Sequence, residues 1–191
     1  MAASLPTIVL VQGAWHTPAN YKSYSDALEA QGFKVLCPQL PSCNNKSPPV
    51  SSFTEDNICT EAGFAELWPQ FIQNFDDGST FPVDPSLLFL GSVEQDIVDK
   101  ALSNLVRSPM SAFEAKSKGD AWRRVPVTYI LTQQDYSVPR LYQDLMLEKV
   151  KSEGVVIKTK DYETCHSVFI TKEKEMVDAV VVAASDKRNL I

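Results

Sequence analysis

The feature that most constrains the fold is a run of apolar, mostly β-branched residues near the start of the chain. Residues Thr7 to Gln12 read TIVLVQ, and Gly13 ends the run. Such a run, with no alternation of apolar and polar residues, is typical of a parallel strand that is covered on both faces. We therefore expect a buried parallel strand over Thr7–Gln12.

The next segments complete a strand–helix–strand unit. Tyr21 to Gln31 carry apolar side chains at helical spacing, and Gly32 follows where the end of a helix favours a residue with positive φ. The stretch FKVLC at 33–37 predicts the second strand, and the proline-rich PQLPSCNNKSPP after it predicts a loop. A unit of this kind predicts a right-handed crossover.

The last third of the chain repeats this rhythm. Its predicted elements are a strand at 127–132, an amphipathic helix at 141–152, a strand at 155–159 and a closing helix at 173–185. The middle is weaker: 54–68 fits a helix, DDGSTFPVDP a loop and VEQDIVDKALSNL a helix. Because no second long β-branched run occurs in the middle, we place the sheet in the two outer blocks. The predicted fold class is α/β.

Composition narrows the range of functions. With 191 residues, 44% of them apolar, the chain fits one domain spanning 1–191. The 24 acidic residues outnumber the 18 basic ones, which disfavours binding to nucleic acid or to an anionic membrane. The four cysteines form no CxxC pair and no cluster with histidine, which predicts free thiols in a reducing compartment and no metal site. The first residues lack the features of a signal peptide or a membrane span. We therefore expect a cytoplasmic protein with a small-molecule substrate and no cofactor, and we leave its oligomeric state open.

Three loops at predicted strand ends carry candidate chemistry. In the first, Gln12 to His16, Gly13 lets the backbone turn and expose N–H groups toward a developing oxyanion. The second contains Asp135, and the third contains Cys165 and His166. Loops at the carboxyl ends of parallel strands converge on one crevice, so an aspartate and a histidine that are distant in sequence can meet there. Aspartate before histidine is also the order of the last two members of an acid–base triad.

Four segments together resemble the small α/β-hydrolases of the esterase and hydroxynitrile-lyase-like branch: PTIVLVQGAWHTPANY, CPQLPS, LTQQDYSVP and CHSVF. The resemblance spans most of the chain. It implies a three-layer helix–sheet–helix fold with a small cap-like segment at about 65–122. It also implies that His166 is a general base, that Asp135 orients it, that the Ala14 N–H is an oxyanion donor and that Trp15 lines the mouth of the pocket.

One departure from that family is large. The nucleophile elbow, G-x-S-x-G, occurs nowhere in the chain. The chain is also roughly fifty residues shorter than an α/β-hydrolase with a cap would be, so we expect the central strand, its serine and the following helix to be missing. Ser92 is the best local substitute because SLLFLGSVEQDIVDKAL reads as an apolar run, a turn and a helix. However, Leu90 and Glu94 stand where the elbow needs glycine, which favours Ser92 as a helix N-cap. Cys59 and Cys165 lack a setting that would lower a thiol pKa.

Several alternatives stay open at this point. A lone histidine such as His166 is often a packed structural residue, and Asp135 could cap the helix that follows it. His16 is expected at a loop or pocket edge. Three functions remain: a hydrolase for a small ester or carbonyl metabolite that is impaired by the missing serine, a lyase, isomerase or cyclase that uses His166 as a base, and a non-catalytic truncated product.

Overall fold

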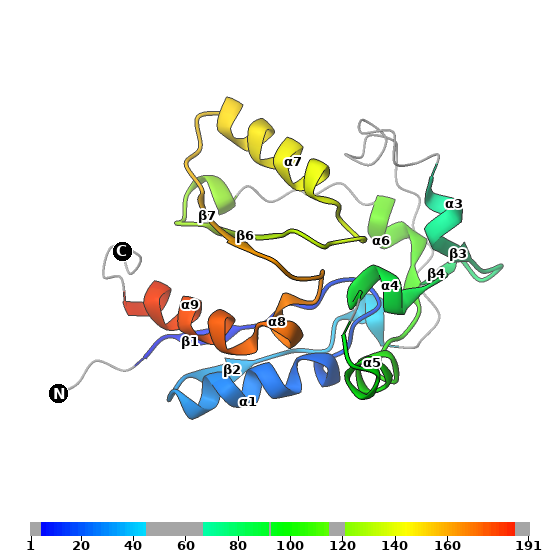
Figure 1. The fold of residues 1–191 in the computed structure, drawn as a ribbon, viewed down its shortest axis with the longest axis horizontal. Helices are drawn as coiled ribbons and strands as arrows, with labels where there is room; N and C mark the ends of the chain where they lie inside the picture. Colours follow the sequence, from blue (N-terminus) through cyan, green and yellow to red (C-terminus); the bar gives the residue numbers. More distant parts are fainter. Residues whose placement is uncertain (1–4, 45–66, 92, 115–120, 186–191) are drawn as a thin grey trace.

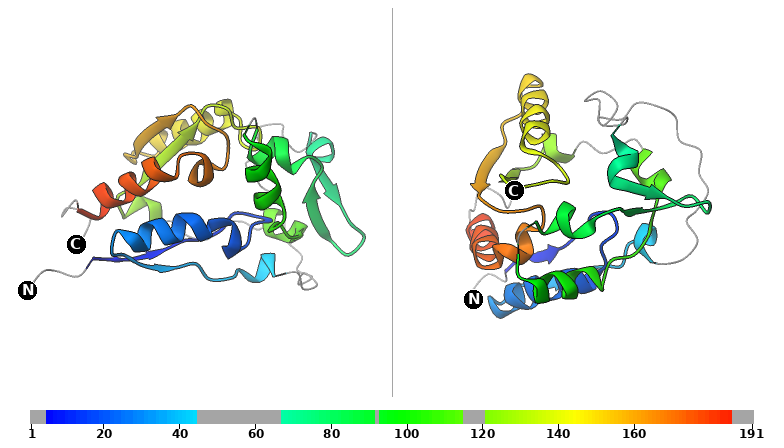
Figure 2. Two further views of the ribbon diagram at one scale, coloured as in Figure 1. Left: turned by 60° about the horizontal axis from the view of Figure 1, so that its bottom comes forward. Right: turned by 45° about the vertical axis from the view of Figure 1, so that its right-hand side comes forward.

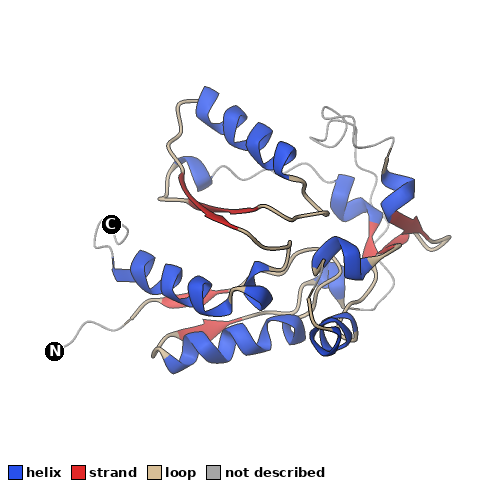
Figure 3. Ribbon diagram, viewed as in Figure 1, coloured by secondary structure: helices blue, strands red, loops and turns tan. Residues whose placement is uncertain are grey.

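The computed structural model describes residues 5–44, 67–91, 93–114 and 121–185. Two pairs of parallel strands, each with helices packed against it, form the two outer blocks of the chain (Figure 1). Residues 67–91 and 93–114, the described part of the cap-like segment, gather beyond one end of the strand pairs (Figure 1 and the left view of Figure 2). Figure 3 shows how helices and strands alternate in this mixed α/β fold.

The first block has the predicted strand–helix–strand order. It contains β1 (Thr7–Val9), the 3₁₀ helix η1 (Pro18–Tyr21), α1 (Lys22–Ala30), β2 (Lys34–Leu36) and the 3₁₀ helix η2 (Pro41–Cys43). The strands are parallel, with Ile8 opposite Val35. Gly32 follows α1 with φ of +89°, the left-handed conformation that glycine adopts at low cost.

One face of this strand pair is covered and the other is open. Leu28 and Tyr24 of α1 form a buried cluster with Phe33 and with Val177 of the last helix, and Ile8 packs against it. On the opposite face, Val9 is 56% exposed and Val11 is 68% exposed. The expectation that Thr7–Gln12 is covered on both faces is therefore wrong, because no described segment packs over these two side chains.

The last block contains β6 (Thr128–Thr132), α7 (Arg140–Ser152), β7 (Lys158–Tyr162), α8 (Val168–Thr171) and α9 (Glu173–Ser185), and it is preceded by the 3₁₀ helix η4 (Ala121–Arg123). The predicted elements are present, but β7 begins three residues later than the predicted strand at 155–159. Strand pairing sets the start of β7, because β7 runs parallel to β6 from Thr128↔Lys158 to Thr132↔Tyr162. The apolar stretch before Lys158 has no part in this ladder.

The two parallel pairs are not hydrogen-bonded into one sheet among the described residues. The single sheet of a three-layer fold is thus present as two parts, β1–β2 and β6–β7. This arrangement is the one expected where the strand between them is missing.

The cap-like segment contains α3 (Trp68–Phe71), β3 (Ile72–Asn74), β4 (Ser79–Pro82), α4 (Pro85–Phe89), α5 (Gln95–Leu102), β5 (Ser108–Pro109) and α6 (Met110–Glu114). The antiparallel order is β3–β4–β5. The prediction that DDGSTFPVDP is only a loop is wrong, because β4 lies inside it. This strand depends on distant partners: Thr80 pairs with Asn74 and with Ser108, and its hydroxyl donates to the Ser108 carbonyl at 2.8 Å. The predicted helix at 54–68 lies outside the described residues up to residue 66.

The segment around Ser92 does not contain the strand that a nucleophile elbow requires. Its apolar run folds as α4, whose N-cap residue Asp84 accepts a hydrogen bond from the Leu87 N–H at 2.9 Å. Ser92 itself lies outside the described residues. The next helix begins at Gln95 with Glu94 at its N-cap position, so the expectation that Ser92 caps it is wrong.

Candidate active site

The loop after β1 is held by its neighbours rather than by its own glycine. The buried Gln12 side chain donates to the Pro38 carbonyl at 2.8 Å and to the Cys37 sulfur at 3.1 Å. The Gly13 N–H donates to the Tyr21 hydroxyl at 3.4 Å. Gly13 does not have a positive φ, and a Cβ added to it would meet no atom within 4 Å. The expectation that Gly13 supplies the unusual turn is therefore wrong.

The left-handed residue of this loop is Trp15, with φ of +64°. A conformation of this kind is uncommon for a bulky residue and persists where surrounding contacts fix it. Here the indole N–H donates to the Thr80 carbonyl and hydroxyl, each at 3.1 Å, and the Trp15 carbonyl accepts from the Val106 N–H at 2.8 Å. The cap-like segment thus fixes the loop. The amide N–H groups of Ala14 and Trp15 have no hydrogen-bond partner among the described residues.

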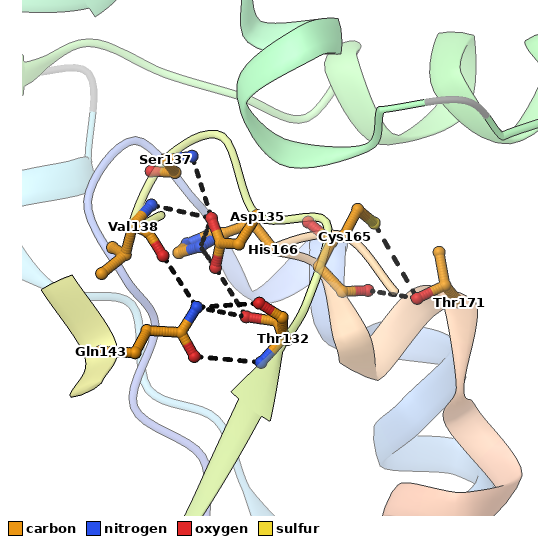
Figure 4. Close-up of polar contacts among 9 residues, drawn as sticks. Thr132, Asp135, Ser137, Val138, Gln143, Cys165, His166 and Thr171 are labelled. Carbon is orange, nitrogen blue, oxygen red and sulfur yellow. Dashed lines mark hydrogen bonds and ion pairs between the residues drawn. The ribbon is translucent and has the colours of Figure 1, made fainter. Parts of the chain in front are cut away.

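The loop after β6 builds a rigid acceptor around Asp135 (Figure 4). One carboxylate oxygen accepts from the N–H groups of Ser137 and Val138, at 2.9 and 2.8 Å. The other accepts from the Thr132 hydroxyl at 2.7 Å. Since α7 begins at Arg140 with Pro139 at its N-cap position, the side chain orders the loop before the helix instead of capping the helix itself.

The structure brings Asp135 and His166 together. His166 Nδ1 lies 2.9 Å from Asp135 Oδ2 and 3.1 Å from Oδ1 (Figure 4). An ionised carboxylate only accepts hydrogen bonds, so the proton of the neutral imidazole is assigned to Nδ1, which leaves the Nε2 lone pair free to act as a base. Nε2 has no partner among the described residues.

The carboxyl group of Asp135 stays ionised at neutral pH. Burial alone would raise its pKa, but the hydrogen bond and charge of His166, the Val138 N–H and the Thr132 hydroxyl together lower the pKa of Asp135 below 3.8. The acid can therefore stabilise an imidazolium that forms when His166 accepts a proton.

One cavity of about 370 Å³ is lined by four of the five predicted site residues, Gly13, Ala14, Trp15 and His166. This volume lies within the range of small-molecule sites. The cavity is lined by the loop after β1, by the loops that carry Asp135 and His166, and by aromatic rings: Gly13, Ala14, Trp15, His16, Tyr21, Phe89, Ser137, Val138, His166 and Phe169. Asp135 supports this wall from behind, because the bonded Ser137 and Val138 belong to it.

No nucleophile is in place beside His166 within the described residues. No serine, threonine or cysteine side chain described in the structure is hydrogen-bonded to its imidazole. The Cys165 sulfur is buried and lies 3.9 Å from the Thr171 hydroxyl (Figure 4). Ser137 lines the cavity, but its hydroxyl makes no hydrogen bond to His166. Cys59, like Ser92, lies outside the described residues.

Two further residues shape the site, and one of them, Gln143, was not predicted from the sequence. His16 was expected at a loop or pocket edge, and it lies in the loop after β1, where it is buried and lines the cavity. Gln143 holds the end of β6: its amide accepts from the Thr132 N–H and donates to the carbonyls of Thr132 and Val138. An isolated glutamine on a helix gives no sequence signal for this role.

Other kinds of site find no support among the residues that the structure describes. No group of three or more histidine, cysteine, aspartate or glutamate side chains in these ranges is arranged to hold a metal ion. None of the described helices has both the length and the apolar character that crossing a membrane requires.

The site as a whole is a hydrogen-bonded His166–Asp135 pair and the loop at residues 13–15, which meet at one cavity at the carboxyl ends of parallel strands. No protein-family model and no curated protein sequence matches the chain. Among solved structures, the chain is similar to a variant of the pyrethroid hydrolase PytH at 12% identity, with 95% of this chain and 98% of that chain covered and a TM-score of 0.67. It is also similar to a pyrethroid hydrolase from Sphingobium faniae JZ-2 at 13% identity, with coverage of 95% and 98% and a TM-score of 0.63.

A third similar structure is an extracellular α/β-hydrolase from a Paenibacillus species. The identity is 12%, the coverage is 95% of this chain and 100% of that chain, and the TM-score is 0.64. That protein is described as sharing structural and functional homology with tobacco salicylic acid binding protein 2. The chain therefore has an α/β-hydrolase-like fold, as its sequence segments predicted.

Proposed function

We propose that this protein is a hydrolase-type enzyme for a small ester or carbonyl metabolite, in which His166 is the general base. The observation that carries the proposal is the position of the imidazole: Asp135 holds Nδ1, and the free Nε2 belongs to a ring that lines the same cavity as the loop at residues 13–15. Asp135 orients the imidazole, and the N–H groups of Ala14 and Trp15 stabilise negative charge on a carbonyl oxygen.

Hydrolysis by this site is impaired. The sequence has no G-x-S-x-G, and no described hydroxyl is hydrogen-bonded to His166. In serine hydrolases, loss of the serine costs about as much as loss of the whole triad, on the order of 10⁶ in kcat. A general base acting directly on water retains a contribution of about 10²–10⁴. We therefore expect slow turnover with no acyl-enzyme intermediate.

Hydrolysis of p-nitrophenyl acetate tests this function. We expect steady, slow release of p-nitrophenol by the wild type, with no initial burst, and a rate at the level of uncatalysed hydrolysis for His166→Ala. Asp26→Ala is the matched control, because Asp26 is exposed on α1 and, within the described part of the chain, pairs only with Lys22. A burst that is stoichiometric with enzyme would show a competent nucleophile. Equal rates for wild type and His166→Ala would remove His166 from the reaction.

A second candidate is a lyase, isomerase or cyclase, and it is favoured by the same free Nε2, to which no hydroxyl of the described residues is hydrogen-bonded. In that chemistry His166 removes a proton next to a carbonyl group while the loop amides hold the enolate, so no covalent intermediate is needed. Exchange of the α-protons of cyclohexanone in D₂O, followed by proton NMR, tests this candidate. Exchange no faster with the wild type than with His166→Ala would exclude it.

The remaining proposals concern organisation and location. We propose that residues 1–191 act as one domain whose segment at about 65–122 serves as the cap over the cavity. The loop contacts made by Thr80 and Val106 support this assignment. We propose a cytoplasmic location, supported by the free thiols of Cys37, Cys43 and Cys165, which suit a reducing compartment.

A further inference from the structure

The cavity contains a second imidazole, His16, that the proposed mechanism does not use. His16 is only 5% exposed. Nδ1 lies 2.8 Å from the carbonyl oxygen of Ala14. Because a carbonyl oxygen only accepts hydrogen bonds, the proton of the neutral ring is assigned to Nδ1. The lone pair is then on Nε2.

Nε2 of His16 has no hydrogen-bond partner among the described residues, and the ring lines the cavity. Burial lowers the pKa of His16 to about 4, so the ring is neutral at neutral pH and Nε2 can accept but not donate a hydrogen bond. In a largely aromatic cavity, a ligand hydroxyl that donates to this acceptor would form a hydrogen bond that is partly shielded from bulk water.

The walls around His16 are aromatic and carry no fixed positive charge. Its ring lies edge-on to Phe89 at 4.9 Å and to Phe169 at 6.3 Å between centroids. Tyr21 stacks on Phe169 at 4.2 Å. No lysine or arginine is among the described residues that line the cavity. Aromatic walls favour a flat apolar group, and a carboxylate or phosphate would find no basic side chain to pair with.

We propose that His16 is a ligand-binding residue that accepts, at Nε2, a hydrogen bond from the hydroxyl group of an uncharged ligand that carries a ring. The inference rests on the proposed function in that it takes this cavity as the substrate site. It adds a selection rule. Of two ligands that differ only in a hydroxyl and its methyl ether, the hydroxyl compound binds more tightly, because the ether cannot donate to Nε2.

Benzyl alcohol and benzyl methyl ether are the test pair, with binding to the full chain measured by ligand-observed NMR. The wild type should prefer the alcohol by about tenfold, the scale of one buried hydrogen bond. His16→Phe keeps a ring but has no acceptor, so its preference should fall to about one. His16→Gln keeps an acceptor oxygen, so its preference should persist.

The two histidines of the chain allow a direct second measurement on the wild type, which does not depend on the folding of any variant. Long-range proton–nitrogen NMR should show both rings protonated at Nδ1, and added benzyl alcohol should shift Nε2 of His16. Binding of neither compound at millimolar concentration, an equal preference in wild type and His16→Phe, or an unmoved Nε2 would each overturn the inference. Retained turnover with equal binding of both compounds would contradict the inference alone. Selective binding without His166-dependent turnover would contradict the proposed function alone.

Discussion

The protonation of His16 should set the pH dependence of stability in mildly acidic solution. Burial lowers its pKa from 6.5 to about 4 in the folded protein, whereas the unfolded chain takes up the proton near 6.5. Between these values the unfolded state binds more protons than the folded state, so the free energy of unfolding rises with pH through this window. The contribution is complete above pH 6.5 and is lost as the pH falls to about 4.

The size of the effect follows from the shift. A change of about 2.5 units at about 1.36 kcal/mol per unit gives about 3 kcal/mol, with a slope of at most about 1.4 kcal/mol per pH unit. Asp135 contributes stability that is lost only as the pH falls through its own lowered pKa, below 3.8, so the two windows are separate. Tyr21 and His166 are the other titratable groups near the His16 ring. Both are retained in a His16→Phe variant, whose ring keeps the packing against Phe89.

Urea unfolding followed by tryptophan fluorescence, at half-unit steps from pH 4 to pH 7.5, measures this contribution. Between pH 7 and pH 4, the free energy of unfolding should fall by about 3 kcal/mol more for the wild type than for His16→Phe. This comparison does not depend on how much the two proteins differ in stability at pH 7. His16→Gln, which does not titrate, should follow the flatter profile of His16→Phe. Parallel profiles for the wild type and both variants would refute the conclusion that the folded protein holds this imidazole neutral.

Three further tests, on four substitutions, have expected outcomes. Gln143→Leu should lower the unfolding free energy by about 2–4 kcal/mol, because the buried amide bonds both main-chain groups of Thr132, and a loss under 1 kcal/mol would contradict that role. Leu28→Ala, at a side chain with no exposure, should lower the free energy of unfolding by about 2–5 kcal/mol. Leu141→Ala, at 67% exposure, should change it by no more than about 0.5 kcal/mol. Similar losses for the two variants in urea unfolding would be inconsistent with the assigned core. Asp135→Asn should reduce the histidine-dependent rate of p-nitrophenyl acetate hydrolysis by up to about 10⁴, and an unchanged rate would argue against the acid–base pair.

Elements with a strong local pattern could be predicted from the sequence. The helix before Gly32, Lys22–Ala30, and the closing helix Glu173–Ser185 depend on apolar periodicity and on residues within one turn of their ends. Their bounds therefore agree with the predictions to within one or two residues. The strands β4 and β7 depend on partners far away in the chain. By its sequence Ser79–Pro82 fits a turn, but it forms a strand because Ser108–Pro109 pairs with it. The bounds of β7 are likewise set by its pairing with β6.

The site divides in the same way. The meeting of Asp135 and His166 follows from a rule of topology, because loops at the carboxyl ends of parallel strands converge. The place of His16 at the pocket follows from the same rule, because its loop leaves β1. Its burial and the contacts of Gln143 depend on which side chains surround them, and the sequence holds no signal for that. Gly13 shows the limit of residue type as a guide: the left-handed conformation is at Trp15, where contacts with the cap-like segment, not backbone freedom, fix it.

The site also joins the parts of the fold. β1–β2 and β6–β7 share no sheet among the described residues, and the packing of α1 against Val177 of α9 joins the two blocks. Contacts around the cavity join each block to the cap-like segment: the Trp15 indole donates to Thr80, and the Ser167 N–H donates to the Phe89 carbonyl at 2.9 Å. The cavity forms only when these parts are docked. A ligand that binds it therefore stabilises the folded protein by an amount that grows with the ratio of its concentration to Kd. Site variants should change stability and activity together, so a loss of turnover counts as chemical only where the unfolding free energy is unchanged.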